Sequence, residues 1–339
     1  MEYNKIIITN LASFYKVNLF NAMNEKIRIL VIFTGEDANI RDGNFFNNNL
    51  LFDYIDLSGL KTFKKLETVW KVIKKYNYEE LIIGGWDSIL YWQSAFISPT
   101  SKNSVIVESS YHESKTTGIK AKVKKLFLYN ISKAYVSGFS QKEILVRLNY
   151  KGNIIVTKGV GVFNYKPQMP YLEKDKVRRF IYIGRLSPEK NLVPLIEVFN
   201  KLPRYILNII GYGPQGEYLK SIANKNVIFH GSINNEELPK LFSDNEVLIL
   251  PSISEPWGLV VEEAFNNGLP VIVSNRVGCA KEIVKHKENG LIFDIHKKDD
   301  LYNTIIMITD VSLYNKMRLN ISKMDFEKVS SKHIELFVN

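Results

Sequence analysis

The stretch VLILPSISEPWGLVVEEAF, residues 247–265, decides the fold class of the second half of the chain. Its first four residues are uniformly apolar, as in a strand that is buried on both faces of a parallel sheet. Apolar residues then recur at helical spacing, at Val260, Val261, Ala264 and Phe265. A strand, a tight turn containing Pro256 and Gly258, and a helix therefore follow one another, which is typical of an open α/β sheet.

The turn between this strand and helix has the features of an anion and sugar site. The pattern predicts a helix N-terminus at Gly258, Leu259 and Val260, where backbone N–H groups lack intrahelical partners and the helix dipole is positive. Glu255 faces the same loop, and Glu263 lies about one and a half turns further, where it could accept hydrogens from ribose hydroxyls. Taken alone, this pattern would more often mean that Glu255 is an ordinary turn residue and that Glu262 and Glu263 are solvated helix surface.

A second element, YIGRLSPEKN at residues 182–191, strengthens the ligand-binding interpretation. A β-like run ends at Gly184, and a helix with an apolar face begins at Asn191. Arg185 and Lys190 therefore follow the carboxyl end of a strand, which is the ligand-binding edge of an open α/β sheet. A forked guanidinium and a flexible ammonium can together neutralise a diphosphate.

Together, the two elements resemble those of family 4 glycosyltransferases, which are retaining enzymes of the GT-B fold. The family pattern is Gly-Arg-(four residues)-Lys, followed by Glu-(seven residues)-Glu. The chain matches it with Arg185, Lys190, Glu255 and Glu263. Further matches occur at 211–214, 230–231, 268–272 and 289–293. The resemblance implies an α/β fold with two Rossmann-like domains, their parallel sheets facing a central cleft, and a nucleotide diphosphate sugar as donor substrate.

The resemblance also assigns roles to the matched residues. Arg185 and Lys190 are predicted to be catalytic, because fixed cations stabilise the charge that develops on a leaving diphosphate. Glu255 is predicted to be catalytic by holding the hydroxyls of the sugar and stabilising the positive character of the anomeric carbon. Glu263 is predicted to bind the ribose of the donor. The remaining predicted donor-binding residues are Gly258, Leu259, Val260, Gly211 and Gly213.

The N-terminal half resembles a bacterial branch of the same family that builds surface polysaccharides. The segments that carry this likeness are 13–21, 84–87 and 108–110. Lys16 and Glu108 are predicted to bind the acceptor. His112 follows a strand that ends at Glu108, and the resemblance implies a catalytic position in contact with the transferred sugar. The alternative for His112 is an ordinary loop residue.

Apolar runs alternate with helical patterns along the whole chain, which predicts parallel sheets. The predicted strands are 5–9, 29–34, 81–84, 104–108, 134–136, 180–184, 206–211, 227–230, 247–250, 271–274 and 291–293. The proline-bearing stretch 166–170 is the predicted boundary. Residues 1–166 then form an N-terminal acceptor domain and 167–318 a donor domain, while resemblance implies that 319–339 is a helix returning to the N-terminal domain.

Composition narrows the class of protein. The single cysteine, Cys279, excludes an intramolecular disulfide and a cysteine-rich metal site. No apolar run reaches the ~18 residues of a membrane span, and the first residues lack a secretory profile, so we expect a cytoplasmic protein. No Asp-x-Asp occurs, and the five histidines suggest no metal cluster. We therefore expect neither metal nor cofactor, and expect His286, His296 and His333 to be exposed.

Positive charge is concentrated in the first half of the chain. Residues 1–165 carry 22 basic and 14 acidic residues, a balance of +8, against 23 and 21, or +2, in the remainder. The stretches 61–75 and 115–133 combine lysines with helical apolar stripes. In the second, Ile119, Val123, Leu126 and Phe127 oppose Lys120, Lys122, Lys124 and Lys125. Such a helix suits an anionic bilayer, and an ordinary sheet-covering helix fits equally well. No motif supports nucleic-acid binding.

The resemblance implies a retaining transferase of EC class 2.4 that moves a sugar to a hydroxyl of a glycan or lipid-linked glycan in bacterial surface polysaccharide synthesis. The stretch GYGPQG, 211–216, would alone suggest a nicotinamide dehydrogenase, but the acidic residue expected ~20 positions later is replaced by His230-Gly231. Two alternatives remain open at this point. One is a GT-B epimerase or phosphorylase, and the other is a non-catalytic nucleotide-sugar-binding protein.

Overall fold

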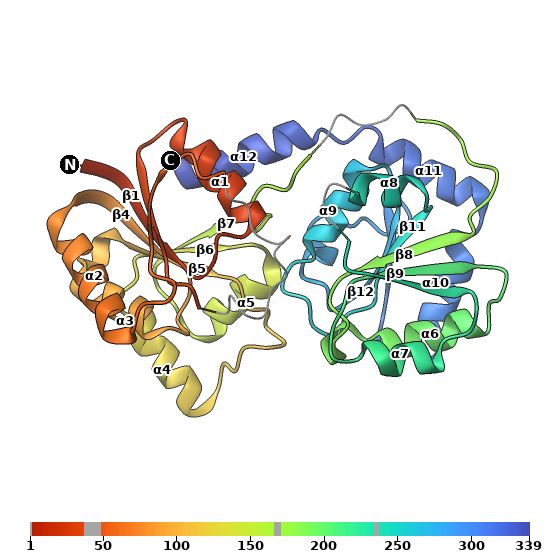
Figure 1. Cartoon of the computed structure of the whole chain (residues 1–339), viewed down its shortest axis with the longest axis horizontal. Coiled ribbons are helices and arrows are strands. Elements are labelled where there is room, and N and C mark those ends of the chain that lie inside the picture. Colours follow the sequence, from red (N-terminus) through yellow and green to blue (C-terminus); the bar gives the residue numbers. More distant parts are fainter. Residues whose placement is uncertain (1, 37–48, 166–170, 234–236) are drawn as a thin grey trace. The chain divides into compact units, whose positions relative to one another are not determined.

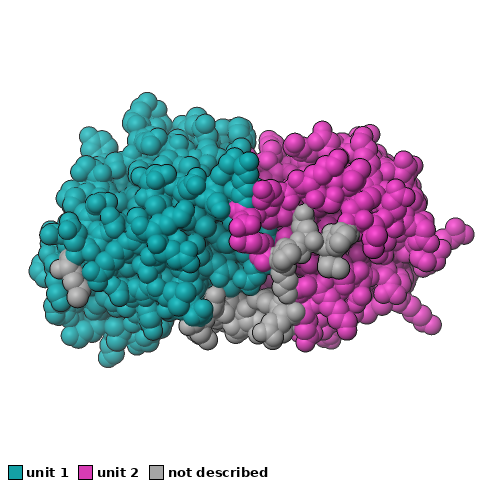
Figure 2. Space-filling view, turned by 90° about the horizontal axis from the view of Figure 1, so that it is seen from above, with its two compact units in different colours: residues 1–164, 328–339 teal, residues 165–327 magenta. Residues whose placement is uncertain are grey.

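A computed structural model describes residues 2–36, 49–165, 171–233 and 237–339, which divide into two compact α/β units. Unit 1 comprises residues 1–164 and 328–339, and unit 2 comprises residues 165–327. Figure 1 shows the elements of each unit, and Figure 2 colours unit 1 teal and unit 2 magenta. Each unit contains one parallel sheet. The predicted fold class, two parallel-sheet α/β domains, is therefore confirmed.

Unit 1 contains a seven-stranded parallel sheet in the order β3-β2-β1-β4-β5-β6-β7. Its strands are β1 Glu2–Thr9, β2 Ile29–Phe33, β3 Asp53–Asp56, β4 Asn77–Ile83, β5 Asn103–Val107, β6 Lys133–Val136 and β7 Asn153–Val156. Its helices are α1 Phe14–Asn24, α2 Thr62–Lys75, α3 Ile89–Ile97, α4 Gly118–Leu128, α5 Phe139–Arg147 and α12 Phe326–Val338. All of these strand pairs are parallel, an arrangement that requires a crossover connection between paired strands.

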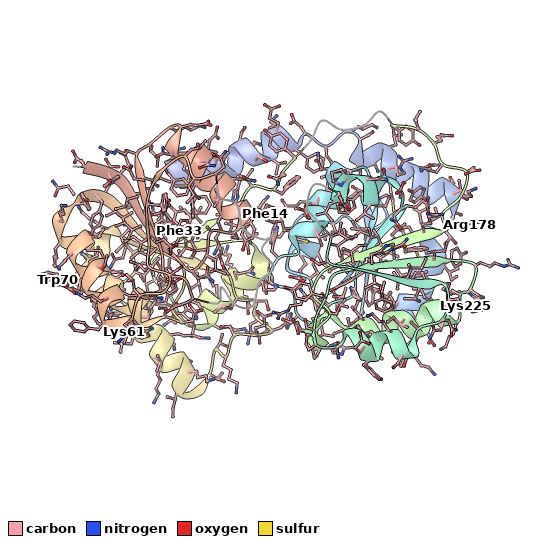
Figure 3. The ribbon with its side chains drawn as sticks, in the orientation of Figure 1. Phe14, Phe33, Lys61, Trp70, Arg178 and Lys225 are labelled. Carbon is pink, nitrogen blue, oxygen red and sulfur yellow. The ribbon has the colours of Figure 1, made fainter. Side chains whose placement is uncertain are left out.

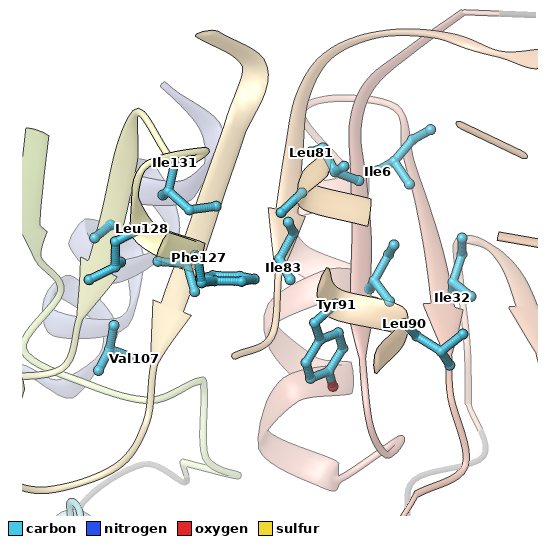
Figure 4. Packing of buried hydrophobic residues seen from close by; sticks show 14 of the residues in the cluster. Ile6, Ile32, Leu81, Ile83, Leu90, Tyr91, Val107, Phe127, Leu128 and Ile131 are labelled. Atoms are coloured by element: carbon cyan, nitrogen blue, oxygen red, sulfur yellow. The ribbon is translucent and has the colours of Figure 1, made fainter. Parts of the chain in front are cut away.

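Successive residues of β1 supply the cores on the two faces of the unit 1 sheet, as the two-residue period of a strand requires. Ile6 and Ile8 belong to a cluster with residues of α2, α3, α4 and α5. Figure 4 shows part of this cluster, in which Ile32 of β2 lies near Leu90 of α3, and Ile6 of β1 lies near Leu81 of β4. Ile7 belongs to a second cluster with residues of α1 and α12. Burial on both faces explains why these strands are continuous apolar runs.

Helix α12 packs on unit 1 through Phe337. Its ring stacks on that of Tyr135 in β6, with centroids 4.6 Å apart. The returning segment starts later than the sequence predicts, because residues 319–321 belong to α11 and unit 1 resumes at Lys328. The predicted boundary stretch 166–170 lies outside the described residues.

His333 of α12 is buried, so the expectation that it is exposed is wrong. Its Nδ1 lies 3.0 Å from the carbonyl oxygen of Thr157, and its side chain is packed against Phe337. Burial lowers the pKa of His333, although the hydrogen bond to Thr157 opposes this shift. The neighbouring lysines in sequence concealed this position, because they occupy the opposite, solvated face of the same helix.

Unit 2 contains a six-stranded parallel sheet in the order β10-β9-β8-β11-β12-β13. Its strands are β8 Arg179–Ile183, β9 Ile206–Ile210, β10 Val227–Gly231, β11 Val247–Leu250, β12 Val271–Ser274 and β13 Gly290–Phe293. Its helices are α6 Leu192–Asn200, α7 Gly216–Ile222, α8 Leu238–Ser243, α9 Leu259–Asn266, α10 Asp300–Ile308 and α11 Val311–Ile321, with short 3₁₀ turns η4 Pro188–Lys190 and η5 Gly278–Lys281. Arg178 and Lys225, labelled in Figure 3, precede β8 and β10 and mark the amino-terminal edge of this sheet.

No helix of the described residues combines the length and the apolar character that crossing a membrane requires.

Candidate active site

Strands β8 and β11 are neighbours in the middle of the unit 2 sheet, where the strand order changes direction. Ligands of open α/β sheets bind at the carboxyl ends of strands beside such a switch point. The β8–α6 loop carries Arg185 and Lys190, and the β11–α9 loop carries Glu255. The backbone N–H of Ile253 donates to the carbonyl of Glu189 at 2.9 Å and ties the two loops together. The two elements found in the sequence therefore meet at the edge where a ligand is expected.

Lys190 and Glu255 form an ion pair at this edge, between Nζ and Oε2. Their side chains are only 17% and 14% exposed, so both charges are largely shielded from water. The hydroxyl of Ser252 donates to the same carboxylate oxygen at 3.5 Å. Partial burial strengthens the attraction between opposite charges relative to an exposed pair. Glu255 is therefore held in one orientation, with its charge matched by a residue 65 positions away in sequence.

Arg185 is the more accessible cation of the site, with a side chain that is 40% exposed. Its Nη2 lies 3.3 Å from Oε1 of Glu189, which also accepts a hydrogen bond from Ser187 at 2.5 Å. Burial raises the pKa of Glu189, but the bonds from Ser187 and Arg185 outweigh this and lower it. Because exposed ion pairs contribute little free energy, Arg185 can leave Glu189 for a phosphate at small cost.

The helix N-terminus predicted from the sequence is present, since α9 begins at Leu259. Gly258 precedes it with φ of +95°, a conformation that other residues adopt only with strain. A Cβ at this position would lie 3.0 Å from Cγ1 of Val277 and 3.1 Å from Cδ2 of Leu250. Glycine is therefore required both by the backbone and by the close packing around it. The amides of Leu259 and Val260 precede the first intrahelical bond and are suited to an anion.

The two adjacent glutamates of α9, Glu262 and Glu263, are not solvated helix surface, which is the alternative to a site role. Glu262 is 8% exposed, and its Oε2 accepts a hydrogen bond of 2.8 Å from the indole N–H of Trp257. Burial raises the pKa of Glu262 to about 7, although the bond from Trp257 opposes the shift. Burial and the neighbouring Glu262 raise the pKa of Glu263 to about 8. A protonated Glu263 can donate as well as accept a hydrogen bond, which suits the two-way bonding of a ribose hydroxyl.

Trp257 and Glu262 are site residues that sequence reasoning missed. Trp257 lies between Glu255 and Gly258 and is 2% exposed, so the bond to Glu262 fixes the turn that carries Glu255. A signal was present in the sequence, because α9 is apolar on most of its surface. A helix of this kind is buried on most sides, and a carboxylate within it requires a partner.

We expect the stability of the protein to depend on pH through Glu262. Its folded pKa of about 7 is above the ordinary value of 4.5. The stability linked to its protonated form is fully present below about pH 4.5 and is lost as the pH rises through about 7. Glu262→Gln keeps an acceptor for Trp257 but cannot ionise. The thermal midpoint of the variant minus that of the wild type should therefore increase as the pH is raised from about 5 to about 8.5. A constant difference between them would show that Glu262 does not titrate in this range.

Gly211 and Gly213 lie in the loop after β9, beside the β8–α6 loop. A Cβ on Gly211 would lie 1.9 Å from the carbonyl oxygen of Gly184, and one on Gly213 would lie 2.4 Å from that of Leu186. The close approach that requires glycine is therefore to protein backbone. It packs the two loops into one wall of the site. Contact of these glycines with the donor remains a prediction.

Unit 1 holds the remaining predicted residues. Lys16 of α1 is buried, and its Nζ lies 2.7 Å from Oε1 of Glu108, which follows β5. Burial acts to lower the pKa of Lys16, but the charge of Glu108 outweighs it and raises the pKa. Both residues line a small cavity with Ser137, whose hydroxyl has no hydrogen-bond partner among the described residues. His112 is exposed in the loop after β5, in edge contact with Tyr111.

The ammonium of Lys16 has three acceptors within hydrogen-bond distance. They are the carboxylate of Glu108, the hydroxyl of Thr9 at 3.2 Å and the side-chain oxygen of Asn10 at 3.4 Å. An ammonium has three N–H donors, so Lys16 has none left for a substrate in this arrangement. Glu108 is 37% exposed at its side chain. The geometry therefore suits Glu108 for direct contact with an acceptor and Lys16 for orienting Glu108.

The region that carries this site matches a known protein family. Residues 168–324 match the family described as glycosyl transferases group 1, and they lie within unit 2. Unit 2 is therefore similar to the group 1 glycosyltransferases over nearly its whole length. Its Lys190–Glu255 pair and the α9 N-terminus both lie inside the matched region.

Relatives of the matched region include proteins of archaea, bacteria and a plant. The chain is 30% identical over 167 residues to an uncharacterized glycosyltransferase of Methanocaldococcus jannaschii, covering 47% of this chain and 40% of that protein. It is also 30% identical over 184 residues to O-antigen chain mannosyltransferase B of Escherichia coli, covering 48% of each. The matches thus span less than half the length of these relatives.

Among solved structures, Anabaena HepE in complex with UDP and glucose is similar over 99% of both chains. The TM-score is 0.73 and the sequence identity is 16%. This likeness extends beyond the matched region and supports the GT-B fold for the chain as a whole.

Proposed function

We propose that the protein is a retaining glycosyltransferase. It moves one sugar from a nucleotide diphosphate sugar to a hydroxyl of a glycan or lipid-linked glycan in bacterial surface polysaccharide synthesis. The observation that carries this proposal is the Lys190–Glu255 pair, held at the switch point of the unit 2 sheet beside the N-terminus of α9. The similarity to HepE, whose solved structure is a complex with UDP and glucose, supports the donor class, and the similarity to an O-antigen mannosyltransferase supports the product class.

The proposed reaction breaks the bond between the anomeric carbon and a diphosphate oxygen. Negative charge grows on the diphosphate as this bond lengthens, and Arg185, Lys190 and the first amides of α9 stabilise it. Glu255 binds hydroxyls of the sugar and stabilises the positive character of the anomeric carbon. Glu263 binds the ribose. The acceptor oxygen attacks from the face that the diphosphate leaves, and a diphosphate oxygen takes its proton, so the anomeric configuration is retained.

Unit 1 supplies the acceptor side in this proposal. Glu108, oriented by Lys16, accepts hydrogen bonds from acceptor hydroxyls, and His112 contacts the transferred sugar. The proposed location is the cytoplasm, with the acceptor met at the inner face of the plasma membrane.

A panel of nucleotide sugars tests the proposal. A donor present at 100 times its dissociation constant stabilises the folded protein by ~2.7 kcal/mol, which a thermal-shift measurement detects. The stabilising donor is then incubated with glycan acceptors, and the anomeric configuration of the product is determined by NMR. An inverted product would contradict retention. Conversion of the donor without an acceptor would favour an epimerase, and stabilisation without any chemistry would favour a binding protein.

We expect EDTA to leave transfer activity largely intact. Arg185, Lys190 and the α9 N-terminus can stabilise a leaving diphosphate without a divalent ion. The measurement is the initial transfer rate with EDTA, compared with the rate after adding manganese or magnesium. A rate that falls to background with EDTA and returns with metal would show that a metal ion shares this role.

A further inference from the structure

Helix α4 turns an apolar stripe outward from unit 1. Four residues spaced three or four apart are exposed: Ile119 (80%), Val123 (47%), Leu126 (58%) and Tyr129 (87%), the last at the C-cap. Side chains at this spacing share one helix face. The sheet is covered by other residues of the helix, at Ala121, Phe127 and Leu128. The helix therefore has a second apolar face, which stays exposed to solvent.

The structure corrects two members of the amphipathic pattern seen in the sequence. Phe127 is fully buried, and its ring contacts Trp92 of α3 at 5.2 Å. Lys124 bonds to the hydroxyl of Ser114 and the carbonyl of Lys115, so it fixes the start of the helix. Burial, and secondarily the charge of Lys120, lower the pKa of Lys124. The residues left on the outer surface are the four apolar residues and Lys120, Lys122 and Lys125.

The charge around the stripe has one sign. Residues 115–133 contain six lysines and no acidic residue. Exposed apolar residues continue on the neighbouring helices, at Phe63 and Trp70 among the lysines of α2 and at Phe96 of α3, which is 54% exposed. The acidic Glu67 of α2 is paired with Lys64 and Lys71. Figure 1 shows α2, α3 and α4 along one side of unit 1, and Figure 3 shows Trp70 at its outer edge. Exposed apolar residues framed by lysines on a helix are the features of a helix that lies in the interface of an anionic bilayer.

We propose that α4 docks unit 1 on an anionic lipid bilayer. Ile119, Val123, Leu126 and Tyr129 enter the boundary between headgroups and acyl chains, and Lys120, Lys122 and Lys125 contact lipid phosphates. The docking would bring the acceptor side of the proposed glycosyltransferase to lipid-linked acceptors. Only this role in acceptor delivery rests on the proposed function, because lipid binding itself is measured without any sugar transfer.

Co-sedimentation with vesicles tests the proposal. The full chain should bind vesicles of phosphatidylglycerol and phosphatidylcholine, and should not bind phosphatidylcholine alone. Because each lysine near an anionic surface strengthens binding about fivefold, changing Lys120, Lys122 and Lys125 to Gln should weaken it about 100-fold at low salt. Changing Ile119, Val123 and Leu126 to Ser should also weaken binding, but should keep its salt dependence. Added salt should release the wild type, because the Debye length falls from ~30 Å at 0.01 M to ~3 Å at 1 M.

The matched control changes three exposed lysines of unit 2, Lys285, Lys297 and Lys298, to Gln and should bind as the wild type does. All substituted residues are exposed, so thermal midpoints should not move. Equal loss in the control and the α4 lysine variant would assign binding to net charge alone and overturn the proposal. No binding by the wild type would also overturn it, and self-association removed by the Ser variant would assign the stripe to a protein contact. Transfer to a soluble acceptor tests the proposed function separately.

Discussion

Glu255→Gln is expected to lower the rate of sugar transfer at least ~100-fold, the loss typical when a charged group that stabilises a transition state is removed. Glutamine has nearly the same shape, so it can still accept a hydrogen bond from Lys190 or Ser252. It lacks the negative charge that pairs with Lys190 and stabilises positive character at the anomeric carbon. Initial rates at saturating donor, with the circular dichroism spectrum as a check on folding, make the measurement.

Glu288→Gln is the matched control for this experiment. Glu288 is 60% exposed and precedes β13, so it lies at the amino-terminal edge of the same sheet. Glu262 lies one position outside the Glu-(seven residues)-Glu spacing, so by sequence alone its substitution should be silent. It cannot serve as the control, because it is buried and bonded to Trp257. Equal rates for Glu255→Gln and the wild type would remove Glu255 from the active site.

Glu80→Ala is expected to destabilise unit 1 by about 3–5 kcal/mol, the usual effect of removing one partner from a buried ion pair. Oε2 of Glu80 lies 2.7 Å from Nζ of Lys5, and its Oε1 lies 3.1 Å from Nζ of Lys133. The hydroxyls of Ser104 and Tyr135 donate to the same carboxylate. Lys5 is only 4% exposed, so the alanine variant leaves a buried ammonium without its counter-charge.

Urea unfolding monitored by tryptophan fluorescence measures this effect, since Trp70, Trp86 and Trp92 lie in unit 1 and only Trp257 lies in unit 2. The control is Glu143→Ala, which breaks an exposed pair with Arg147 and should cost less than about 1 kcal/mol. Burial acts to raise the pKa of Glu80, but Lys5, Ser104 and Lys133 outweigh it and lower the pKa. Its contribution to stability is therefore present above about pH 4.5 and is lost as the pH falls through the lower folded pKa. Similar midpoints for the two alanine variants would contradict the prediction.

The strands of both sheets were largely predictable because parallel strands are buried on both faces and are therefore apolar throughout. All eleven predicted runs overlap strands of the structure. The strands β3 and β7 were missed. Both are edge strands, and β3, Asp53–Asp56, is mostly exposed, so it has no apolar run to detect.

Local sequence predicted the loops of the site but not the contacts between them. The position of Arg185, Lys190 and Glu255 after two strands follows from pattern alone. That Lys190 pairs with Glu255 depends on β8 and β11 being neighbours, which is a property of the strand order. The bond from Trp257 to Glu262 and the burial of His333 similarly depend on packing that periodicity does not specify.

The return of α12 to unit 1 has a consequence for the order in which the protein folds during synthesis. Unit 2 is continuous in sequence, whereas unit 1 needs residues on both sides of it. Tyr135 stays uncovered by Phe337 until the whole of unit 2 has left the ribosome. Domains tend to fold as units as they emerge, so unit 2 can complete its core first. The unit that is synthesised first is then the one that finishes folding last.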